Sequence, residues 1–353
     1  MKKIAVLGGD GIGPEVVREA TLLLEELRDR GLPIALWPLD LGAERYLRDG
    51  TTFPAEVRAT LASEYSAVLL GALGDPRVPG LEHARDILFG LRFGFDLYAN
   101  VRPVKALADR LVPLTGRTAR DVDLLVFREN TEGIYVGIGG QMRRGTPDEI
   151  AINEDVNTRK GVERIQRAAF EHARTRPRKR LHMADKSNAM RHAHELWLRV
   201  FDELRREYPD VEASHVYVDA LCMYVIQDPS QFDVIVTNNL FGDIVTDLGA
   251  ALQGGLGMAG SANVHWSDPS RLALFEPVHG SAPPLAGKAV ANPFAALLTV
   301  GMMLAHLGWP ELERRIERAV IEALDAGRCT RDVGGTLSTP EAAAWVRERL
   351  RAT

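Results

Sequence analysis

The feature that most constrains the fold is the alternation, along most of the chain, of short apolar runs with amphipathic helical patterns. Runs such as 4–7, 67–70, 124–127 and 234–236 contain no polar residue, which is typical of parallel strands buried on both faces. Between such runs, apolar residues recur at helical spacing, over residues 160–173, 188–207, 241–252, 293–307 and 312–326. Strands that alternate with helices predict an α/β architecture with a mixed, largely parallel sheet.

Composition narrows the class of protein further. The 353 residues are 46% hydrophobic and carry 43 basic and 48 acidic side chains, for a formal charge of −5. The charges of both signs are interspersed, which gives no reason to expect nucleic acid as a partner. The longest apolar stretch, 295–309, is interrupted by Gly301, His306 and Gly308 and is too short to span a membrane. With only two cysteines, the chain is expected to be a soluble, cytoplasmic enzyme with no membrane partner.

The pattern breaks between residues 131 and 154. Five glycines in this segment separate two short β-prone pieces, 134–136 and 150–152. This arrangement predicts a protruding hairpin, or arm, of the kind that often clasps a second subunit. Neither an internal repeat nor a Ser-rich linker marks a domain boundary.

Three aspartates are candidate metal ligands. Asp243 and Asp247 follow the buried strand 234–236 and a glycine-containing turn, and their spacing of four places them on one face of a helix. Like charges at that spacing repel unless a cation or an arginine neutralises them; the alternative is a pair of helix N-terminal carboxylates, one of them solvated. Asp219, after the β-like piece 215–218, would be a third carboxylate. Because no Cys–His cluster accompanies them, these ligands favour Mg²⁺ or Mn²⁺ over Zn²⁺.

Arginine, lysine and tyrosine residues suggest an acidic substrate. Arg92, Arg102 and Arg128 could converge on a di- or tricarboxylate, since guanidinium groups bind carboxylates through two parallel hydrogen bonds. A surface ion pair is the alternative for each of them. Lys186 could act as a base and Tyr135 could deliver a proton, the alternatives being a solvated lysine and a half-buried core tyrosine.

Two glycine-rich loops and one basic run have several interpretations. Residues 8–13 do not fit the dinucleotide fingerprint G-x-G-x-x-G, because Val16 stands where the last glycine belongs. Small residues in the loop 276–287, after the strand-like run 272–275, would let backbone N–H groups approach a phosphate. The five cations of residues 174–180 surround Pro177, and we expect a solvated turn there rather than a nucleic-acid patch.

Together these motifs resemble the β-decarboxylating dehydrogenase family, whose members act on isopropylmalate, isocitrate, homoisocitrate, tartrate or D-malate. The resemblance runs almost end to end, through GDGIGPE at 9–15, ANVRP at 99–103, RENTEG at 128–133, DKSN at 185–188, NLFGD at 239–243, EPVHG at 276–280 and DVGG at 332–335. It implies a two-domain fold that is not a Rossmann fold, in an obligate homodimer. Residues 1–98 plus 254–353 would form the large domain with the dinucleotide loop, and 99–253 the small domain with the dimer interface and the arm.

The resemblance also implies roles for individual residues. Arg92, Arg102 and Arg128 would hold the substrate carboxylates, while Asp219, Asp243 and Asp247 would hold Mg²⁺ or Mn²⁺, with Asp219 also beside the substrate. Lys186 would be the base and Tyr135 would reprotonate the product enol. In this family Lys186 and Asp219 reach the active site from the neighbouring subunit. The residues that would hold the dinucleotide are Ile12, Glu276, His279, Gly280, Ser281, Ala282 and Asn292.

The substrate follows from the residues just before Arg92. Leu88 takes the place of a pocket leucine of isopropylmalate dehydrogenases, and an apolar pocket would leave a third carboxylate desolvated and unpaired. We therefore expect NAD- and metal-dependent conversion of (2R,3S)-3-isopropylmalate to 2-oxoisocaproate and CO₂, a step of leucine biosynthesis. Bulky Phe89 and the motif 128–133 keep two alternatives open: homoisocitrate or isocitrate, and D-malate or tartrate.

Two further alternatives concern the cofactor, NAD or NADP, and the class of protein, an enzyme or a regulatory subunit. Pro284 stands where NAD-dependent members carry an Asp and NADP-dependent members a Lys. Because residues 284–287 contain no cation to hold a 2′-phosphate, the sequence favours NAD over NADP. A non-catalytic regulatory subunit that binds ligands is the alternative from a different class. Such subunits usually lose a metal aspartate, the lysine or the tyrosine, all of which are present here.

Overall fold

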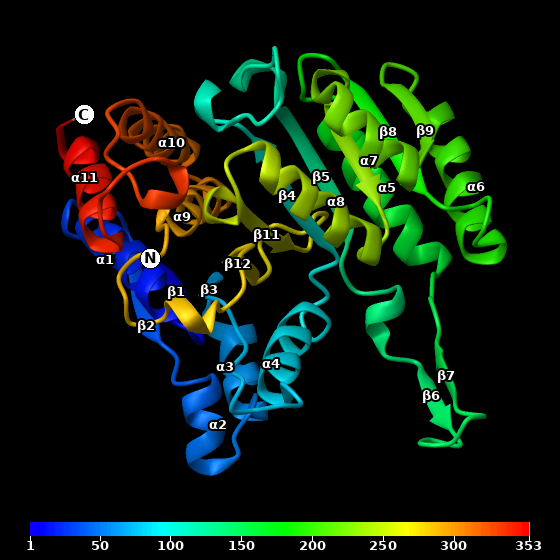
Figure 1. Cartoon of the computed structure of the whole chain (residues 1–353), viewed down its shortest axis with the longest axis horizontal. Coiled ribbons are helices and arrows are strands. Elements are labelled where there is room, and N and C mark those ends of the chain that lie inside the picture. Colours follow the sequence, from blue (N-terminus) through cyan, green and yellow to red (C-terminus); the bar gives the residue numbers. More distant parts are fainter. Residues whose placement is uncertain (353) are drawn as a thin grey trace.

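A computed structural model describes residues 1–352, and ten strands of the chain form one sheet (Figure 1). Their order across the sheet is β2-β1-β3-β12-β11-β4-β5-β10-β8-β9. The bounds of these strands are β1 Lys2–Leu7, β2 Ile34–Pro38, β3 Ala67–Leu70, β4 Ala99–Lys105, β5 Asp123–Glu129, β8 Arg180–Asp185, β9 Glu212–Tyr217, β10 Val234–Thr237, β11 Gly260–Val264 and β12 Ala273–Pro277.

The sheet is parallel at both ends and antiparallel in its middle. At one end, β1 pairs in parallel with β2 and with β3, and β3 pairs in parallel with β12. At the other end, β10 pairs in parallel with β5 and with β8, and β8 pairs in parallel with β9. The antiparallel pairs are β12–β11, β11–β4 and β4–β5. The prediction of a mixed, largely parallel sheet is therefore confirmed, and the fully apolar runs lie in β1, β3, β5 and β10.

Helices cover both faces of this sheet. On the reverse face, helices α1, α5, α6, α9, α10 and α11 share one continuous hydrophobic core with the strands. On the front face the core is divided in two, one part under α3 and α4 and the other under α7 and α8. The helices are α1 Gly13–Asp29, α2 Ala43–Asp49, α3 Ala55–Glu64, α4 Glu82–Arg92, α5 Arg159–Ala173, α6 Arg191–Glu207, α7 Val218–Gln227, α8 Asn239–Leu252, α9 Phe294–His306, α10 Pro310–Asp325 and α11 Thr339–Ala352. Within residues 1–352, no helix combines the length and hydropathy needed to cross a membrane.

The central strands present different chemistry to the two faces. Successive side chains of a strand point to opposite faces. On β4, Arg102 faces the front whereas Val101 faces the reverse side. On β11, Ser261 likewise faces the front and Ala262 faces the reverse side. The division of the front-face core and these polar side chains place the candidate site on the front of the sheet.

The arm is a two-stranded antiparallel hairpin of β6 Gly139–Met142 and β7 Ile150–Asn153, exposed at every residue. It projects well away from the rest of the molecule (Figure 1), which confirms the prediction of a protruding hairpin. The expectation that 134–136 is β-like was wrong, because this piece is a 3-10 turn. Gly133 and Gly137 flank it with φ of +80° and +73°, and these left-handed residues end the extended chain on both sides.

Two boundaries and one charged segment also differ from expectation. The strand before Asp219 ends at Tyr217, so Asp219 lies in the first turn of α7. Helix α6 begins at Arg191, three residues after the predicted start. In the basic run, Arg176 Nε lies 2.6 Å from the buried carboxylate of Asp233. The expectation of a solvated turn was therefore wrong for Arg176, whose ion pair joins the chain before β8 to the start of β10.

Candidate active site

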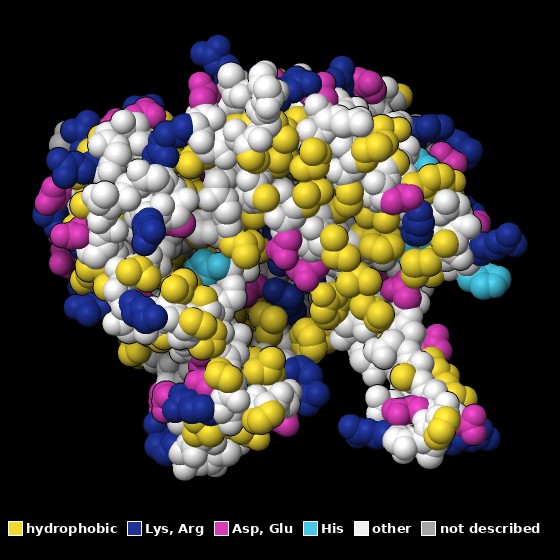
Figure 2. All heavy atoms as spheres, viewed as in Figure 1, with side chains coloured by type: hydrophobic (Ala, Val, Ile, Leu, Met, Phe, Trp, Pro, Cys, Tyr) yellow, Lys and Arg dark blue, Asp and Glu magenta, His cyan; other side chains and the backbone are white. Residues whose placement is uncertain are grey.

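A cavity of about 490 Å³ opens on the front face between α4 and α8, where the front-face core is divided. Its wall combines α4, the front of β4, β5 and β11, and the segments that follow β3 and β12. Figure 2 shows this hollow, with charged side chains at its floor. Predicted site residues in the wall are Leu88, Arg92, Arg102, Arg128, Tyr135, Asp243, Glu276, His279 and Gly280.

Arg128, near the end of β5, lies at the centre of the site and is only 2% exposed. Its Nε donates a hydrogen bond of 2.9 Å to Asn239 Oδ1, and its Nη1 pairs with Asp243. The guanidinium lies 5.4 Å from the centre of the Tyr135 ring. The arginine stem passes directly beneath Gly242 of α8, where a Cβ would come within 2.6 Å of Arg128 Cβ. The glycine therefore permits the close approach that joins Arg128 to Asp243.

Arg102 and Arg92 are the other buried cations of the wall. Arg102 Nη1 donates to Thr246 Oγ1 at 2.7 Å and lies 3.3 Å from Asp243 Oδ1, while Arg92 pairs with Glu276 at 2.7 Å. Burial lowers the pKa of Arg102. Within the described chain, the Nε atoms of Arg92 and Arg102 are buried without a hydrogen-bond partner. Three guanidinium groups face two carboxylates here, so the cavity favours an anionic ligand.

Asp243 and Tyr135 are joined by a hydrogen bond beside these arginines. Burial alone would raise the pKa of Asp243, but the charges of Arg128 and Arg102 outweigh it and lower that pKa. Tyr135 Oη donates to Asp243 Oδ2 at 3.1 Å. Burial, followed by the Asp243 charge, raises the pKa of Tyr135. The tyrosine hydroxyl thus keeps its proton at neutral pH and can deliver it.

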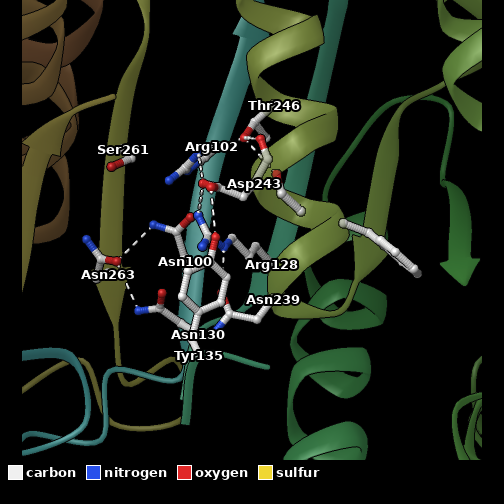
Figure 3. A network of polar contacts seen from close by, with 12 residues as sticks. Asn100, Arg102, Arg128, Asn130, Tyr135, Asn239, Asp243, Thr246, Ser261 and Asn263 are labelled. Carbon is white, nitrogen blue, oxygen red and sulfur yellow. Dashed lines mark hydrogen bonds and ion pairs between the residues drawn. The ribbon is translucent and has the colours of Figure 1, made fainter. Parts of the chain in front are cut away.

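Three buried asparagines link the wall residues, and sequence reasoning missed them (Figure 3). Asn263 Oδ1 accepts hydrogen bonds from Asn100 Nδ2 at 2.9 Å and Asn130 Nδ2 at 3.0 Å. Asn263 Nδ2 donates to Glu276 Oε1 at 3.0 Å, the oxygen that also pairs with Arg92. The amide side chains of Asn100 and Asn263, which lie in buried strands, were the available signal, because buried amides need partners.

Asp10 of the first glycine-rich loop holds the far wall of the cavity in place. Its buried carboxylate accepts hydrogen bonds of 2.7 Å from the backbone N–H groups of Ala43 and Gly74. It also lies 2.8 Å from His83 Nε2 at the start of α4, the helix that ends at Arg92. Sequence reasoning rejected this loop as a dinucleotide fingerprint and used it for the family resemblance, but missed its structural carboxylate.

The predicted dinucleotide residues divide into two groups. Glu276, His279 and Gly280 line the cavity, and His279 Nε2 is buried without a partner among the described residues. Burial lowers the pKa of His279, which leaves a neutral ring nitrogen available to a ligand. Ile12 N–H donates to Ser281 O at 2.8 Å, which joins the two glycine-rich loops beside the cavity rather than in its wall. Ala282 is the N-terminal cap of a 3-10 turn and has a φ of +39°.

Asn292 lies outside the cavity wall, at the start of α9. Its Nδ2 donates to Asp332 Oδ2 at 3.0 Å, and its Oδ1 accepts from Phe294 N at 2.9 Å. These bonds fix the turn before α9 and account for the side chain without a ligand.

The three candidate metal ligands do not meet within one chain. Asp243 and Asp247 share a face of α8, and burial, followed by the Asp243 charge, raises the pKa of Asp247. Asp219 lies on α7 and pairs with Lys186 Nζ at 2.7 Å. Residues 1–352 of a single chain contain no group of three acidic, histidine or cysteine side chains that could hold a metal. The hard oxygens and mutual repulsion of Asp243 and Asp247 suit a divalent cation, with a further ligand from elsewhere.

Lys186 is positioned rigidly but outside the cavity of its own chain. It follows β8, and its backbone N–H donates to His194 Nδ1 at 2.8 Å. The preceding Asp185 is buried and accepts from Ser187. The Lys186 ammonium holds the pKa of Asp219 below its usual range. The two side chains therefore form an ion pair beside α7.

This fold and this cavity define an α/β protein whose arginine-rich front cavity favours an anionic ligand. The family model for isocitrate/isopropylmalate dehydrogenase matches residues 3–346, and the chain belongs to that family. It is 45% identical to 3-isopropylmalate dehydrogenase of Thermobifida fusca over 349 residues, which covers 99% of this chain and 97% of that protein. The corresponding protein of Beutenbergia cavernae is 46% identical over 340 residues, 95% of this chain and 97% of that one.

Solved structures show the same relationship. Isocitrate dehydrogenase from Methylococcus capsulatus superposes with a TM-score of 0.89 at 37% identity, covering 99% of this chain and all of the other. The TT0538 protein from Thermus thermophilus gives a TM-score of 0.88 at 39% identity, covering 99% of this chain and 68% of that chain. The predicted family is thereby confirmed.

Proposed function

We propose that the protein is an NAD- and divalent-metal-dependent oxidative decarboxylase of a 2-hydroxy-3-carboxy acid, with (2R,3S)-3-isopropylmalate as the favoured substrate and leucine biosynthesis as its role. The observation that carries this proposal is the convergence of Arg92, Arg102 and Arg128 on one cavity with Asp243 and Tyr135. The relatives named 3-isopropylmalate dehydrogenase support the choice of substrate.

The arginines bind and orient the substrate. A carboxylate placed among them would accept hydrogen bonds from the unpartnered Nε atoms of Arg92 and Arg102. Because the partners of Arg128 and Arg102 already fix both guanidinium groups, little side-chain entropy is lost on binding. The substrate hydroxyl then lies near Asp243, and Tyr135 lies on the same wall.

Asp243 and Asp247 of one chain, with Asp219 of a second copy, would hold Mg²⁺ or Mn²⁺. Such a cation lowers the pKa of a substrate hydroxyl and stabilises negative charge on oxygen. The loop 276–282, with Ile12 and Asn292, would hold NAD, which supplies the hydride acceptor. The unpartnered Nε2 of His279 fits a ligand at this loop.

Lys186 and Tyr135 move the protons. Lys186 of the second copy would take the proton from the substrate hydroxyl as that carbon is oxidised. After the β-carboxylate leaves as CO₂, Tyr135 would donate its proton to the carbon that lost the carboxylate. Its raised pKa and its hydrogen bond to Asp243 fit a proton donor in this position.

We propose a cytoplasmic homodimer in which α7, α8 and the arm meet their counterparts. Figure 2 shows hydrophobic side chains gathered over α7 and α8 and along the arm. The exposed apolar residues there are Ile138, Met142, Ile150, Ile152, Tyr217, Met223, Tyr224, Ile226 and Ile244. Such a patch is typical of an interface. Two of its residues, Tyr217 and Met223, flank Asp219 in the sequence. The two domains of each chain would be 1–98 plus 254–353, and 99–253.

Two side chains of the cavity wall, Arg85 and Phe89, favour other substrates of the same family. The apolar part of the wall contains Leu73, Leu88 and Phe89, which suits an isopropyl group. Arg85, which sequence reasoning missed, lines the same wall one helical turn before Phe89. This cation would pair with a third carboxylate and so favours homoisocitrate or isocitrate. Phe89 stacks on Phe93 at 5.0 Å between ring centres, and its bulk favours D-malate or tartrate.

A panel of these 2-hydroxy acids with NAD and with NADP tests the proposal. We expect kcat/KM for isopropylmalate with NAD to exceed that for homoisocitrate and D-malate about tenfold, since one apolar group contributes about 1–3 kcal/mol. Arg85→Ala should preserve isopropylmalate turnover while lowering any activity on tricarboxylates. Lys186→Ala and Asp243→Asn should abolish decarboxylation and leave the circular dichroism spectrum unchanged; near-normal turnover in either variant would refute the assignment.

A further inference from the structure

A second cavity, of about 600 Å³, lies on the reverse face of the central strands. The alternation of strand residues relates it to the active site: Val101, Ala262 and Phe275 line the reverse cavity, while their neighbours Arg102, Ser261 and Glu276 line the front one. A single layer of backbone thus separates the two. The volume falls within the range of small-molecule sites, about 300–1,000 Å³.

The wall of the reverse cavity is largely apolar and partly aromatic. Strands β4 and β5 form one side with α5, and β11 and β12 form the other with α9 and α10. Apolar residues of the wall include Val101, Leu125, Val264, Trp266, Phe275 and Met302. Trp266 packs edge-on against His172 at 5.8 Å between ring centres, which gives the cavity an aromatic side.

The cations of this wall are already neutralised. Lys105 Nζ pairs with Glu317 Oε1 at 2.5 Å. Arg176 pairs with Asp233 at 2.6 Å and with Asp123 at 3.1 Å. Each of these two side chains therefore already has a carboxylate partner.

Two hydrogen-bond acceptors of the wall are unused. The Glu313 carboxylate has no hydrogen bond within the described part of the chain. Burial, followed by the charge of Glu317, raises its pKa, and the charges of Lys105 and Arg314 oppose this rise. His306 bonds to the backbone of Pro269, and its Nε2 is buried without a partner among the residues described. Burial lowers the pKa of His306, so the ring stays neutral and Nε2 acts as an acceptor.

We propose that the reverse cavity is a second ligand site, which takes a small primary amine with an aromatic or branched apolar body. The ammonium group donates to Glu313 and His306, and the apolar body packs against Trp266 and Phe275. This charge complementarity disfavours carboxylates, the class of ligand that the front cavity favours. Since the site uses none of the proposed catalytic residues, it stands or fails independently of the proposed function.

Calorimetric titration of the full-length protein with phenethylamine tests this site, with 3-phenylpropionate as the probe of opposite charge. Glu313→Gln removes the charge at nearly constant volume and should weaken phenethylamine binding about tenfold. Ala305→Trp places an indole in the cavity and should abolish binding, and Met302→Trp serves the same purpose if the first variant does not fold. Glu311→Gln, on the same helix but outside the cavity, is the matched control and should bind like the wild type.

A saturating concentration of the dehydrogenase substrate should not change the affinity for phenethylamine, because the amine does not occupy the front cavity. Any of the following results would overturn the proposal: no detectable binding of phenethylamine, equal binding by the wild type and the tryptophan variant, or tighter binding of phenylpropionate than of the amine. Loss of binding in Glu311→Gln to the same degree as in Glu313→Gln would also overturn it.

Discussion

Gly242→Ala is a sharp test of how α8 and β5 build the site. Gly242 lies where the two elements approach most closely, and an added Cβ would stand 2.6 Å from both Cβ and Cγ of Arg128. Atoms do not approach so closely, so α8 or the arginine must move. Helix α8 carries Asp243, and any such movement therefore changes the Arg128–Asp243 pair.

The expected loss of stability of Gly242→Ala is small, whereas the expected loss of activity is large. Overpacking of a filled interior costs about 1–3 kcal/mol, whereas alanine in place of a helical glycine contributes about 1 kcal/mol. The free energy of unfolding should therefore fall by about 1 kcal/mol, and Tm by roughly 1 °C for a chain of this size. Catalysis is more sensitive, because a displacement of about 1 Å at the reacting groups lowers kcat/KM roughly 100-fold.

Gly249→Ala supplies the matched control. Gly249 lies on the same helix, and its added Cβ would stand 2.5 Å from Val104 Cγ2, in the core and away from the arginines. Thermal unfolding and steady-state kinetics on both variants should show similar losses of Tm but a large loss of kcat/KM only for Gly242→Ala. If Gly242→Ala retains wild-type kcat/KM, or if Gly249→Ala loses as much activity, the close approach does not position the site.

Three further changes have expected outcomes. Burial lowers the pKa of His182 to about 4 from 6.5. As the pH falls from 7 to 4, the unfolded chain binds a proton that the folded chain does not, so the free energy of unfolding should fall by about 3 kcal/mol. His182→Phe should remove this part of the pH dependence in urea unfolding, and an unchanged slope would contradict the assignment. Asn263→Ala leaves the amide of Asn100 unpaired and removes one of the two hydrogen bonds of Asn130 Nδ2, which keeps its bond to Leu97 O. The free energy of unfolding should therefore fall by about 1–3 kcal/mol, and KM should rise as Arg92 loses its support; wild-type values of both would exclude a positioning role. Chelation of divalent cations should abolish turnover and Mg²⁺ or Mn²⁺ should restore it, whereas turnover that survives exhaustive chelation would exclude the metal site.

Much of the sheet was predictable because its strands are buried on both faces and therefore read as unbroken apolar runs. The same pattern placed Arg128 and Asp243 at strand and helix ends, where such side chains reach a site. Their distance in space was not predictable, since it depends on the order of strands, and β5 pairs with β10 although the two strands are far apart in the sequence. The arm was predictable from its glycines, but its register was not.

Other site features depend on partners that are distant in sequence. Asn100 and Asn263 form a hydrogen bond across 163 residues, and nothing near either residue signals the other. Arg85 resembles any exposed helical arginine until the cavity wall is known. The separation of Asp219 from Asp243 within one chain follows from the placement of α7, which the sequence pattern does not determine.

The central claim is that a complete site needs two copies of the chain. Lys186→Ala and Asp243→Asn should each be inactive alone. Unfolded together and refolded as a mixture, they should recover about a quarter of wild-type turnover, because half the dimers are mixed and each mixed dimer contains one intact site. If each site belongs to a single chain, the mixture will stay inactive, and that result would contradict the shared site directly.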